Sequence, residues 1–385
     1  MRIGWYLSRM SKDRGYERVV SGHVQVPLHS AKLFRDAGHE VEVITTRFPS
    51  SHTVPDCLPP NVPLHFVDDG RKRASDPSEP SRGVDGVKLI QQIRQIVRIA
   101  HAQRFDVLHF SAFDAMAQFA GLLKVVGLRP PVVVSLQQPD LAAPPGWLAR
   151  QLWNRLDAVV VTTDHARQMC ARAGIDAEQV RHGIVFDPQD QPGWNPSGAR
   201  QRVLFWRDPS ARNGADICLE AYDRLAPEFP EIHFDLAVRP HWKPVPGIDD
   251  LAARHENVHV YRFPYPDGIT IPGLLAESLC VLMPFRKQSL DPQLSIMESM
   301  AAEVPVVSTD TGSIPEFIAP RRNGMLIPRG DVGAAVEAVR YCVSDPERAR
   351  GMGRAARKDL LDHWNWGRWV DDLEAVYRRV VESRP

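Results

Sequence analysis

The most informative segment of this chain is residues 284–316, which read PFRKQSLDPQLSIMESMAAEVPVVSTDTGSIPE. A loop marked by prolines leads into a helix that carries Glu298, and an apolar strand at 305–308 is followed by a turn at Gly312. Backbone N–H groups at the start of a helix attract a diphosphate, and a fixed carboxylate can accept hydrogen bonds from two ribose hydroxyls. These features, in this order, predict a pocket for a nucleotide sugar.

Glu298 alone is weak evidence, because any unit of helix and strand can carry a glutamate in its helix. The complete segment is more specific. Glu298 is followed by the helical residues SMAA at 299–302, the strand residues VPVV at 304–307 and the turn GSIPE at 312–316. This pattern resembles the donor-site signature of the family 4 glycosyltransferases, which move a sugar from a nucleotide diphosphate to an acceptor.

The resemblance implies an α/β protein of the GT-B fold, with two facing Rossmann-like domains, parallel sheets and a C-terminal crossover helix. We expect an acceptor-binding domain at residues 1–187, completed by a crossover helix at 366–385, and a donor-binding domain at 188–365. The alternative for the last segment is a surface helix packed on its own domain, because aromatic residues at helical spacing usually belong to a core.

The pattern of elements along the chain is typical of two parallel sheets covered by helices. Gly38 is placed to close a helix in a left-handed conformation. Residues 186–198 are rich in proline, glycine and polar side chains, as expected of a linker. The expected strands lie at 1–7, 40–45, 62–67, 107–110, 132–136, 158–162, 202–206, 233–238, 258–262 and 281–284, and the expected helices include 22–37, 216–225 and 272–278.

The resemblance also implies which residues bind the donor. The leaving diphosphate needs fixed positive charge, which the family supplies with an arginine and a lysine after the first strand of the second domain. Arg207 takes the arginine position, whereas Asn213 takes the lysine position with Arg212 beside it. We therefore expect Arg207 and Arg212 to clamp the diphosphate; solvated surface arginine is the alternative for both.

Glu298 is expected to bind the ribose, whereas the residue that contacts the sugar departs from the family pattern. The family has a first glutamate eight positions before the second, but this chain has Leu290 there. Either the neighbouring Asp291 replaces that glutamate, or the sugar is held differently; with Asp291 in this role, the predicted catalytic residues are Arg207, Arg212, Asp291 and Glu298. The remaining predicted donor contacts are Gly22, Asn213, Pro292, Gln293, Leu294 and Ser295.

The acceptor is expected to bind the first domain. Gly22 stands where the family has a glycine-rich loop, which lets backbone approach the donor. A strand-end histidine of the family is replaced by Gln137, which can hydrogen-bond a hydroxyl but cannot act as a base near neutral pH. The predicted acceptor contacts are Arg14, Tyr16, Arg18, His109 and Gln137; for His109 a structural polar group is the alternative.

Composition excludes several other classes of protein. The chain has 385 residues, 43% hydrophobic and 24% charged, with a formal net charge of zero, which argues against a nucleic-acid binder. Its five dispersed cysteines form no Cys-x-x-Cys pair, as expected of reduced thiols in a cytoplasmic protein with neither disulfides nor a metal site. No leader or membrane-spanning run is evident, and the resemblance implies a nucleotide sugar as substrate with no further cofactor.

Residues 88–100 form an amphipathic pattern with basic residues at 88, 94 and 98. Two interpretations stay open: a helix packed on its own sheet with a solvated basic side, or a peripheral contact with the inner face of an anionic membrane.

Two alternatives to a glycosyltransferase with a glycan, glycolipid or small-molecule acceptor also stay open. The departures from the family pattern at Leu290, Asn213 and Gln137 are compatible with a nucleotide-sugar binding protein without activity. The other alternative is an epimerase of the same fold that acts on the sugar nucleotide. A dinucleotide oxidoreductase is disfavoured, because no Gly-x-Gly-x-x-Gly follows the first strand.

Overall fold

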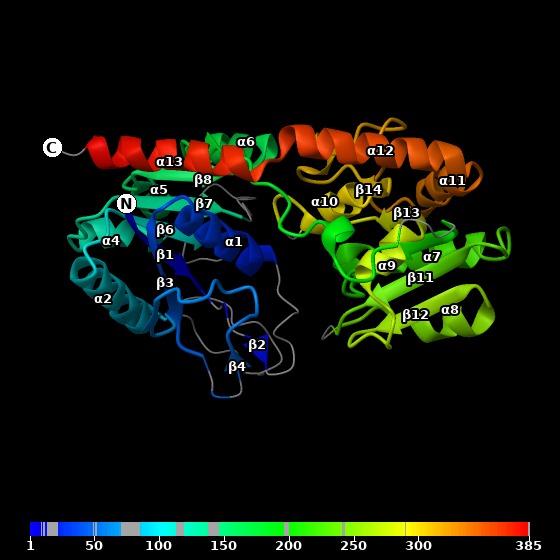
Figure 1. Cartoon of the computed structure of the whole chain (residues 1–385), viewed down its shortest axis with the longest axis horizontal. Helices are drawn as coiled ribbons and strands as arrows, with labels where there is room; N and C mark the ends of the chain where they lie inside the picture. The colour runs from blue at the N-terminus through cyan, green and yellow to red at the C-terminus, as the bar shows by residue number, and fades with distance from the viewer. Residues whose placement is uncertain are drawn as a thin grey trace. The chain divides into compact units, whose positions relative to one another are not determined.

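The structure, a computed structural model, divides into two compact units, each built on a parallel sheet (Figure 1). The first unit comprises Met1–Val185 and Trp366–Pro385, and the second comprises Phe186–Asn365. The predicted α/β class with two parallel sheets is confirmed. The residues described are 1–8, 10, 12–13, 22–48, 50, 52–70, 85–112, 119–137, 146–195, 200–240, 243–288 and 290–383.

The first unit contains a seven-stranded parallel sheet in the order β5-β3-β1-β6-β7-β8-β9. A separate antiparallel pair joins β2 (Lys12–Asp13) to β4 (His52–Thr53). The sheet strands are β1 (Arg2–Leu7), β3 (Glu40–Thr46), β5 (Leu64–Val67), β6 (Val107–Ala112), β7 (Val132–Leu136), β8 (Ala158–Val161) and β9 (Glu178–Gln179).

Helices cover both faces of this sheet because its strands are apolar on both sides. In β1, Ile3 and Trp5 lie in one buried cluster and Tyr6 lies in the other, as the alternation of side chains along a strand requires. The helices are α1 (Gly22–Asp36), α2 (Gly86–Ala102), α4 (Gly121–Val125), α5 (Trp147–Trp153), α6 (Asp164–Arg172) and α13 (Trp366–Glu382). Gly38 has φ +88°, which confirms the left-handed residue that closes α1.

The last helix, α13, belongs to the first unit. Trp369, Leu373, Val376, Tyr377 and Val380 are buried and form one stripe at helical spacing. They share a core cluster with strand residues of the first sheet and with side chains of α1. The chain therefore leaves the second unit after α12 (Pro346–His363) and ends on the first unit, as a crossover helix does.

The second unit contains a six-stranded parallel sheet in the order β12-β11-β10-β13-β14-β15. Its strands are short and largely buried, and each is followed by a loop that leads into a helix or a helical turn. The strands are β10 (Arg202–Phe205), β11 (His233–Val238), β12 (Val258–Arg262), β13 (Ser278–Met283), β14 (Val306–Thr309) and β15 (Gly324–Ile327).

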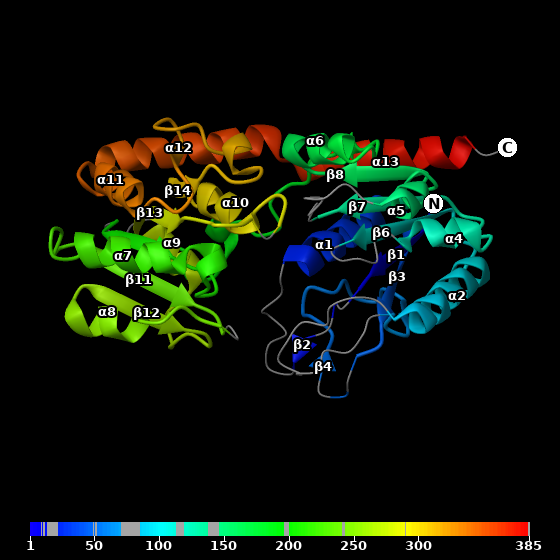
Figure 2. The same cartoon turned by 180° about the vertical axis from the view of Figure 1, so that it is seen from behind.

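One face of the second sheet packs against a single large cluster with side chains from α7 (Ala215–Leu225), α8 (Ile248–Arg254) and α11 (Val332–Val343). Within it, α7 and α11 lie side by side (Figure 2). Helices α9 (Ile271–Ala276) and α12 also contact β13, and α10 (Leu294–Ala301) contacts α12 and β14. Three helical turns complete the unit: η1 (Pro188–Asp190), η2 (Ala211–Asn213) and η3 (Ile314–Glu316).

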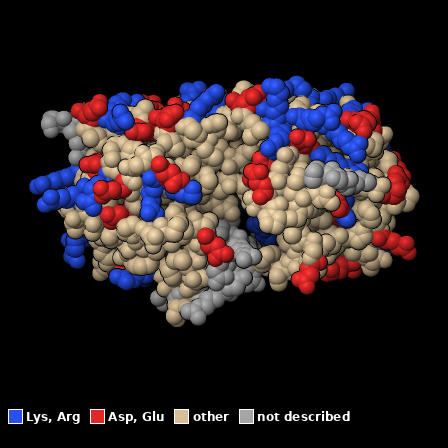
Figure 3. Space-filling view, viewed as in Figure 1, with Lys and Arg blue, Asp and Glu red and all other residues tan. Residues whose placement is uncertain are grey.

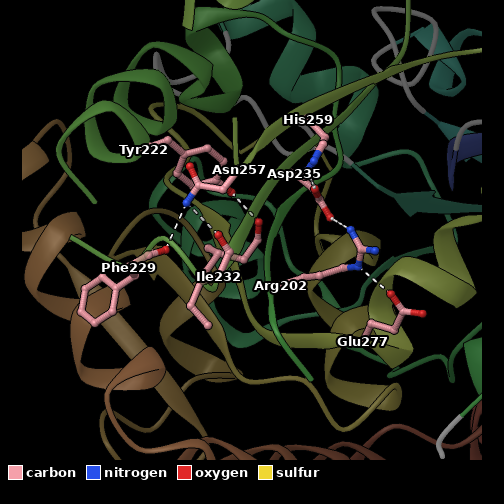
Figure 4. A network of polar contacts seen from close by, with 9 residues as sticks. Arg202, Tyr222, Phe229, Ile232, Asp235, Asn257, His259 and Glu277 are labelled. Atoms are coloured by element: carbon pink, nitrogen blue, oxygen red, sulfur yellow. Dashed lines mark hydrogen bonds and ion pairs between the residues drawn. The ribbon is translucent and has the colours of Figure 1, made fainter. Parts of the chain in front are cut away.

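A charged network fixes the amino-terminal edge of the second sheet (Figure 4). The Asp235 carboxylate is fully buried, accepts a 2.7 Å hydrogen bond from Arg202 Nη1, and lies 3.0 Å from His259 Nδ1. Arg202 Nε donates to Glu277 Oε2 at 2.6 Å. Removing one partner of such a buried pair typically costs about 3–5 kcal/mol of stability, because the other charge stays buried. The network is therefore structural.

Asn257 closes the loops beside this network (Figure 4). Its Nδ2 lies 3.1, 3.0 and 2.9 Å from the carbonyl oxygens of Ala226, Phe229 and Ile232. Tyr222, which is fully buried, donates its hydroxyl to the Val203 carbonyl at 3.1 Å. These contacts satisfy backbone groups that would otherwise be buried without partners where α7 gives way to β11.

Candidate functional site

The strand order of the second unit marks one position for a ligand. In open parallel sheets, ligands bind at the carboxyl ends of the strands, where the chain connections leave in opposite directions. The sheet continues from β10 to β11 on one side and from β13 to β14 on the other, so this position lies between β10 and β13. The segments that follow these two strands contain Arg207 and residues 284–294.

The two segments lie in direct contact. The Arg212 carbonyl accepts hydrogen bonds from the backbone N–H groups of Arg286, at 2.9 Å, and Lys287, at 3.3 Å. Gly214 has φ +78°, and a Cβ atom there would lie 2.0 Å from the Pro284 carbonyl oxygen. Only glycine permits this approach, since any side chain would clash with backbone in a conformation that L residues rarely adopt.

Glu298 lies in α10 at this edge of the sheet and is half-buried. Burial raises the pKa of its carboxyl to about 7, although the positive charges of Arg239 and Arg207 act in the opposite direction. Near neutral pH the carboxyl is therefore poised between its two protonation states.

Arg207 belongs to the same charged cluster. Burial lowers the pKa of its guanidinium, and repulsion from Arg239 adds to this effect. The charges of Asp208 and Glu298 act the other way, and Arg212 contributes further repulsion. Three arginines and two carboxylates thus act on one another at the carboxyl edge of the sheet, where positive charge is in excess.

The helix that carries Glu298 is attached to the sheet through polar contacts. Trp206 Nε1 donates to Ser299 Oγ at 3.2 Å, and Ser299 Oγ donates to the Ser295 carbonyl at 2.7 Å. Trp206 directly precedes Arg207, so these contacts hold α10 and the segment after β10 in one arrangement.

Gln288 ties the loop before α10 to the turn at Gly312. Its Nε2 donates to the Leu290 carbonyl at 2.7 Å and lies 2.8 Å from Ser313 Oγ, and its Oε1 accepts from Ser313 N at 2.8 Å. A Cβ atom on Gly312 would lie 1.9 Å from Gln288 Oε1. Gly312 also has φ +62°, so a larger residue there would be strained and would displace the Gln288 amide.

Among the described residues, no group of three or more His, Cys, Asp or Glu side chains is arranged to hold a metal ion. A hollow in the first unit, lined by Lys32, Arg35, His39 and neighbouring residues, lies beside Glu40, at the amino end of β3. Ligands of parallel sheets bind at the carboxyl ends of the strands, whereas this hollow lies at the amino end of β3. None of the predicted site residues lines it.

Comparison with known proteins agrees with this geometry. The family model described as Glycosyl transferases group 1 matches residues 200–345, and the Glycosyl transferase 4-like domain matches residues 21–182. The chain belongs to the group 1 glycosyltransferases. The family resemblance inferred from the segment around Glu298 is confirmed.

Curated relatives of this glycosyltransferase family match over part of their length. The GDP-mannose-dependent alpha-(1-6)-phosphatidylinositol monomannoside mannosyltransferase of Mycolicibacterium smegmatis is 32% identical over 40% of this chain and 35% of its own length. The D-inositol 3-phosphate glycosyltransferase of Streptomyces avermitilis is 30% identical over 44% of this chain and 37% of its own. In both cases the match spans well under half of the relative's length.

Solved structures of low identity share the fold. A glycosyltransferase from Rickettsia africae superposes with a TM-score of 0.71 at 14% identity, covering 100% of this chain and 99% of that one. The Anabaena protein HepE, solved in complex with UDP and glucose, gives 0.68 at 16% identity, covering 98% and 99%. These similarities confirm the GT-B fold.

The structure brings Arg207 and Glu298 together, and Arg212 lies exposed on the same edge, where its Nη2 donates to the Gln288 carbonyl at 3.3 Å. Asn213 is 2% exposed and donates to the Asp208 carbonyl at 3.3 Å. Its side chain therefore supports the loop after β10.

The predicted sugar contacts lie in the loop before α10 and in its first turn. Asp291, Gln293 and Ser295 are buried, and Pro292 and Leu294 are buried with them. Asp291 is only 6% exposed, so its contact with a sugar stays a prediction.

In the first unit, Gly22 is the first residue of α1, and Gln137 directly follows β7 and is 8% exposed. Gln137 lies at the carboxyl edge of the first sheet, and Gly22 begins the helix that follows β1. Ligands of parallel sheets are expected at this edge. The predicted acceptor contacts Arg14, Tyr16 and Arg18 lie outside the described residues.

The prediction that His109 contacts an acceptor is wrong. His109 is fully buried, its Nδ1 lies 2.6 Å from the Tyr377 hydroxyl, and its ring stacks on Trp5 with centroids 4.4 Å apart. Burial lowers the pKa of His109 to about 3, so the ring stays neutral. It is a core residue beneath α13, which is the structural alternative that the sequence had left open.

Arg239 and Tyr265 were missed by sequence reasoning. Arg239 directly follows β11, and its charge acts on both Glu298 and Arg207. Tyr265 lies in the loop after β12, and Arg239 also acts on its hydroxyl, opposing the rise in pKa that burial causes. The available signal was the end of the strand at Val238, because the residue after a parallel strand belongs to the edge where ligands bind.

We expect Gly214→Ala to lower the free energy of unfolding of the second unit by more than about 3 kcal/mol, since a left-handed conformation and a backbone clash act together. Gly247 is the matched control, because it also precedes a helix with φ +86° but has no atom within 4 Å of a built Cβ. Gly247→Ala should cost only about 1–2 kcal/mol. Equal losses in denaturant unfolding would contradict the close approach at Pro284.

Proposed function

We propose that this protein transfers a sugar from a nucleotide diphosphate sugar to an acceptor. The observation that carries the proposal is the position of Glu298 among arginine side chains, at the carboxyl edge of the second sheet. A carboxylate there can accept hydrogen bonds from ribose hydroxyls, and guanidinium groups match the oxygens of a diphosphate. Sugar-nucleotide transfer needs both groups in one site.

The second unit is the proposed donor-binding part. Glu298 would bind the ribose, and Arg207 with Arg212 would bind the diphosphate. Asp291 and the backbone of residues 292–295 would contact the sugar, because the first turn of α10 presents N–H groups at that end. HepE was solved with UDP-glucose and one relative is named as dependent on GDP-mannose, so uridine and guanosine donors are the first to test.

The proposed chemistry is a displacement at the anomeric carbon with retention of configuration. The bond between that carbon and the diphosphate breaks, a bond to an acceptor oxygen forms, and the diphosphate leaves with the electron pair. Negative charge grows on the leaving group, where Arg207 would stabilise it. The acceptor hydroxyl would give its proton to the departing phosphate, since Gln137 cannot accept one.

The first unit is the proposed acceptor-binding part. Gly22 at the start of α1 and Gln137 after β7 are its described candidates. We propose a glycan, glycolipid or small molecule as the acceptor, and a division of roles between residues 1–187 with 366–385 and residues 188–365.

We further propose a cytoplasmic protein that contacts the membrane through α2. None of the helices among the described residues is long and apolar enough to cross a membrane. One face of α2 is buried in the first unit, through Leu89, Ile93, Ile96 and Ala100. The rest of the helix exposes basic side chains and also Val87 and Ile90, which are 69% and 52% exposed.

Exposed apolar side chains also occur on α4, which contacts α2, and on α5, which contacts α4. At the carboxyl end of α4, the side chains of Val125 and Val126 are exposed. In α5, Trp147 and Leu148 are 75% and 66% exposed. Basic side chains project from the end of the first unit where α2 and α4 lie (Figure 3). Apolar and basic side chains on one surface suit the headgroup region of an anionic membrane.

Transfer is tested by incubating the protein with isotope-labelled UDP-glucose and GDP-mannose, with and without sugar and lipid acceptors. We expect the labelled sugar to leave the nucleotide, and Arg207→Gln to slow this about a hundredfold by removing one charge-assisted contact with the leaving group. Arg254→Gln, an exposed arginine of the same unit, should have no effect. Binding without transfer or hydrolysis for every donor would contradict the proposal, and conversion of the sugar on the nucleotide would indicate an epimerase.

The pH dependence of nucleotide binding tests the role of Glu298. Ribose hydroxyls need an ionised carboxylate as acceptor, and the pKa of Glu298 in the free site is about 7. Affinity for UDP or GDP should therefore fall as pH decreases below about 7, by up to tenfold per pH unit. Glu298→Gln should bind weakly without this dependence, and the ratio of the two proteins removes the titration of the phosphates. Identical pH profiles would show that Glu298 does not bind the ribose.

Membrane contact is tested by co-sedimentation with vesicles of phosphatidylcholine alone and of phosphatidylcholine mixed with phosphatidylglycerol. We expect binding only to the anionic vesicles. The double variant Arg94→Glu, Arg98→Glu should weaken it by at least thirtyfold, because each basic residue contributes about 1 kcal/mol near such a surface. The matched control is Arg224→Glu, Arg254→Glu, on exposed arginines of the second unit. Equal binding by both double variants would overturn the proposal.

A further inference from the structure

Arg239 occupies a position next to Arg207 in the second sheet. It directly follows β11, and β11 pairs with β10 in a register that places Leu236 opposite Phe205. Arg207 lies two residues beyond Phe205, and Arg239 lies three residues beyond Leu236. The two guanidinium side chains therefore leave neighbouring strands at almost the same level, on the edge where the donor site is proposed.

The electrostatics of the cluster agree with this placement. Among the charges that act on Glu298, that of Arg239 is the largest and exceeds that of Arg207. It is also the largest charge that acts on Arg207 itself. Arg239 is thus close to both residues, and the guanidinium groups of Arg207 and Arg239 both act on the half-buried carboxyl of Glu298.

Tyr265 lies close to Arg239. Burial raises the pKa of the Tyr265 hydroxyl, and the neighbouring Arg239 guanidinium opposes this by its charge and by hydrogen bonding. Tyr265 is half-buried in the loop after β12, which is the strand next to β11. The segments that follow three adjacent strands therefore contribute Arg207, Arg239 and Tyr265 to one edge of the sheet.

One position of the cluster, that of Asn213, carries an uncharged side chain. The position at which the family resemblance implies a lysine is occupied by Asn213, which is buried and donates to the Asp208 carbonyl. An amide cannot offset the charge of a diphosphate. Two like charges held close together are unfavourable unless an anion binds between them, and a diphosphate is an anion whose oxygens a pair of guanidinium groups can engage at two places.

We infer that Arg239 supplies a further positive charge that binds the diphosphate of the donor, because Asn213 occupies the position of the family's lysine, and that Tyr265 is its positioning residue. This inference rests on the proposed function. It adds a residue from a different strand, Arg239, to the proposed diphosphate clamp of Arg207 and Arg212.

The test compares nucleoside diphosphates with the corresponding nucleosides by calorimetric titration. Arg239→Gln should weaken the binding of UDP or GDP about a hundredfold, because one charge-assisted contact is lost in a partly desolvated site. It should leave the weaker binding of uridine or guanosine unchanged, since neither has a phosphate. Arg239→Lys should recover part of the loss, because it keeps the charge but not the planar fork.

Tyr265→Phe should weaken diphosphate binding by about five- to tenfold, the usual effect of removing one hydrogen bond, and should again spare the nucleosides. The matched control is Arg262→Gln, which removes an exposed arginine at the end of β12 that pairs with Asp249. It should change neither affinity. The Arg239 effect should shrink as salt is added, because a charge contact is screened.

The outcomes separate the two proposals. If the unaltered protein binds neither UDP nor GDP, the proposed function fails and the inference fails with it. If it binds a diphosphate and Arg239→Gln binds that diphosphate equally well, only the inference about Arg239 is overturned. If Arg239→Gln weakens the nucleoside and the diphosphate to the same extent, Arg239 supports the shape of the site and does not bind phosphate.

Discussion

The constraint on which the second unit depends is the placement of a half-buried carboxylate within reach of two guanidinium groups. Burial opposes the ionisation of Glu298 and also opposes the charge on Arg207, so each is supported by the opposite charge of the other. A parallel sheet makes this arrangement possible, because the carboxyl ends of its strands share one edge. Arg207, Arg239 and the segment before α10 reach the same region from separate strands.

Close packing of the loops maintains this arrangement. The turn at Gly312 accepts the Gln288 side chain, whose amide contacts both that turn and the Leu290 carbonyl. Gln288 thus joins the loop before α10 to the turn at Gly312 through the hydrogen bonds of an uncharged side chain. Trp206 attaches α10 itself, because its indole donates to Ser299 Oγ, which in turn donates to the Ser295 carbonyl.

The sequence predicted the elements of the fold and part of the candidate site. Alternating strands and helices are local patterns, and Glu298 and Gly312 lie in one continuous segment, so both were accessible from the sequence. Arg239 was not, because its role depends on the pairing of β11 with β10. His109 was misassigned for a similar reason: its partner Tyr377 lies 268 residues away in the sequence, on a helix that packs over its strand.

The two charged clusters of the second sheet show how a structural network differs from a candidate ligand site. Burial lowers the pKa of Arg202, but Asp235 and Glu277 more than offset this and raise it overall. For Arg207 the balance is reversed: burial and repulsion from Arg239 outweigh the attraction of Asp208 and Glu298. The first cluster contains its own counterions, whereas the second has an excess of positive charge. An anionic ligand would remove that excess, which is why the carboxyl edge is the one that favours binding.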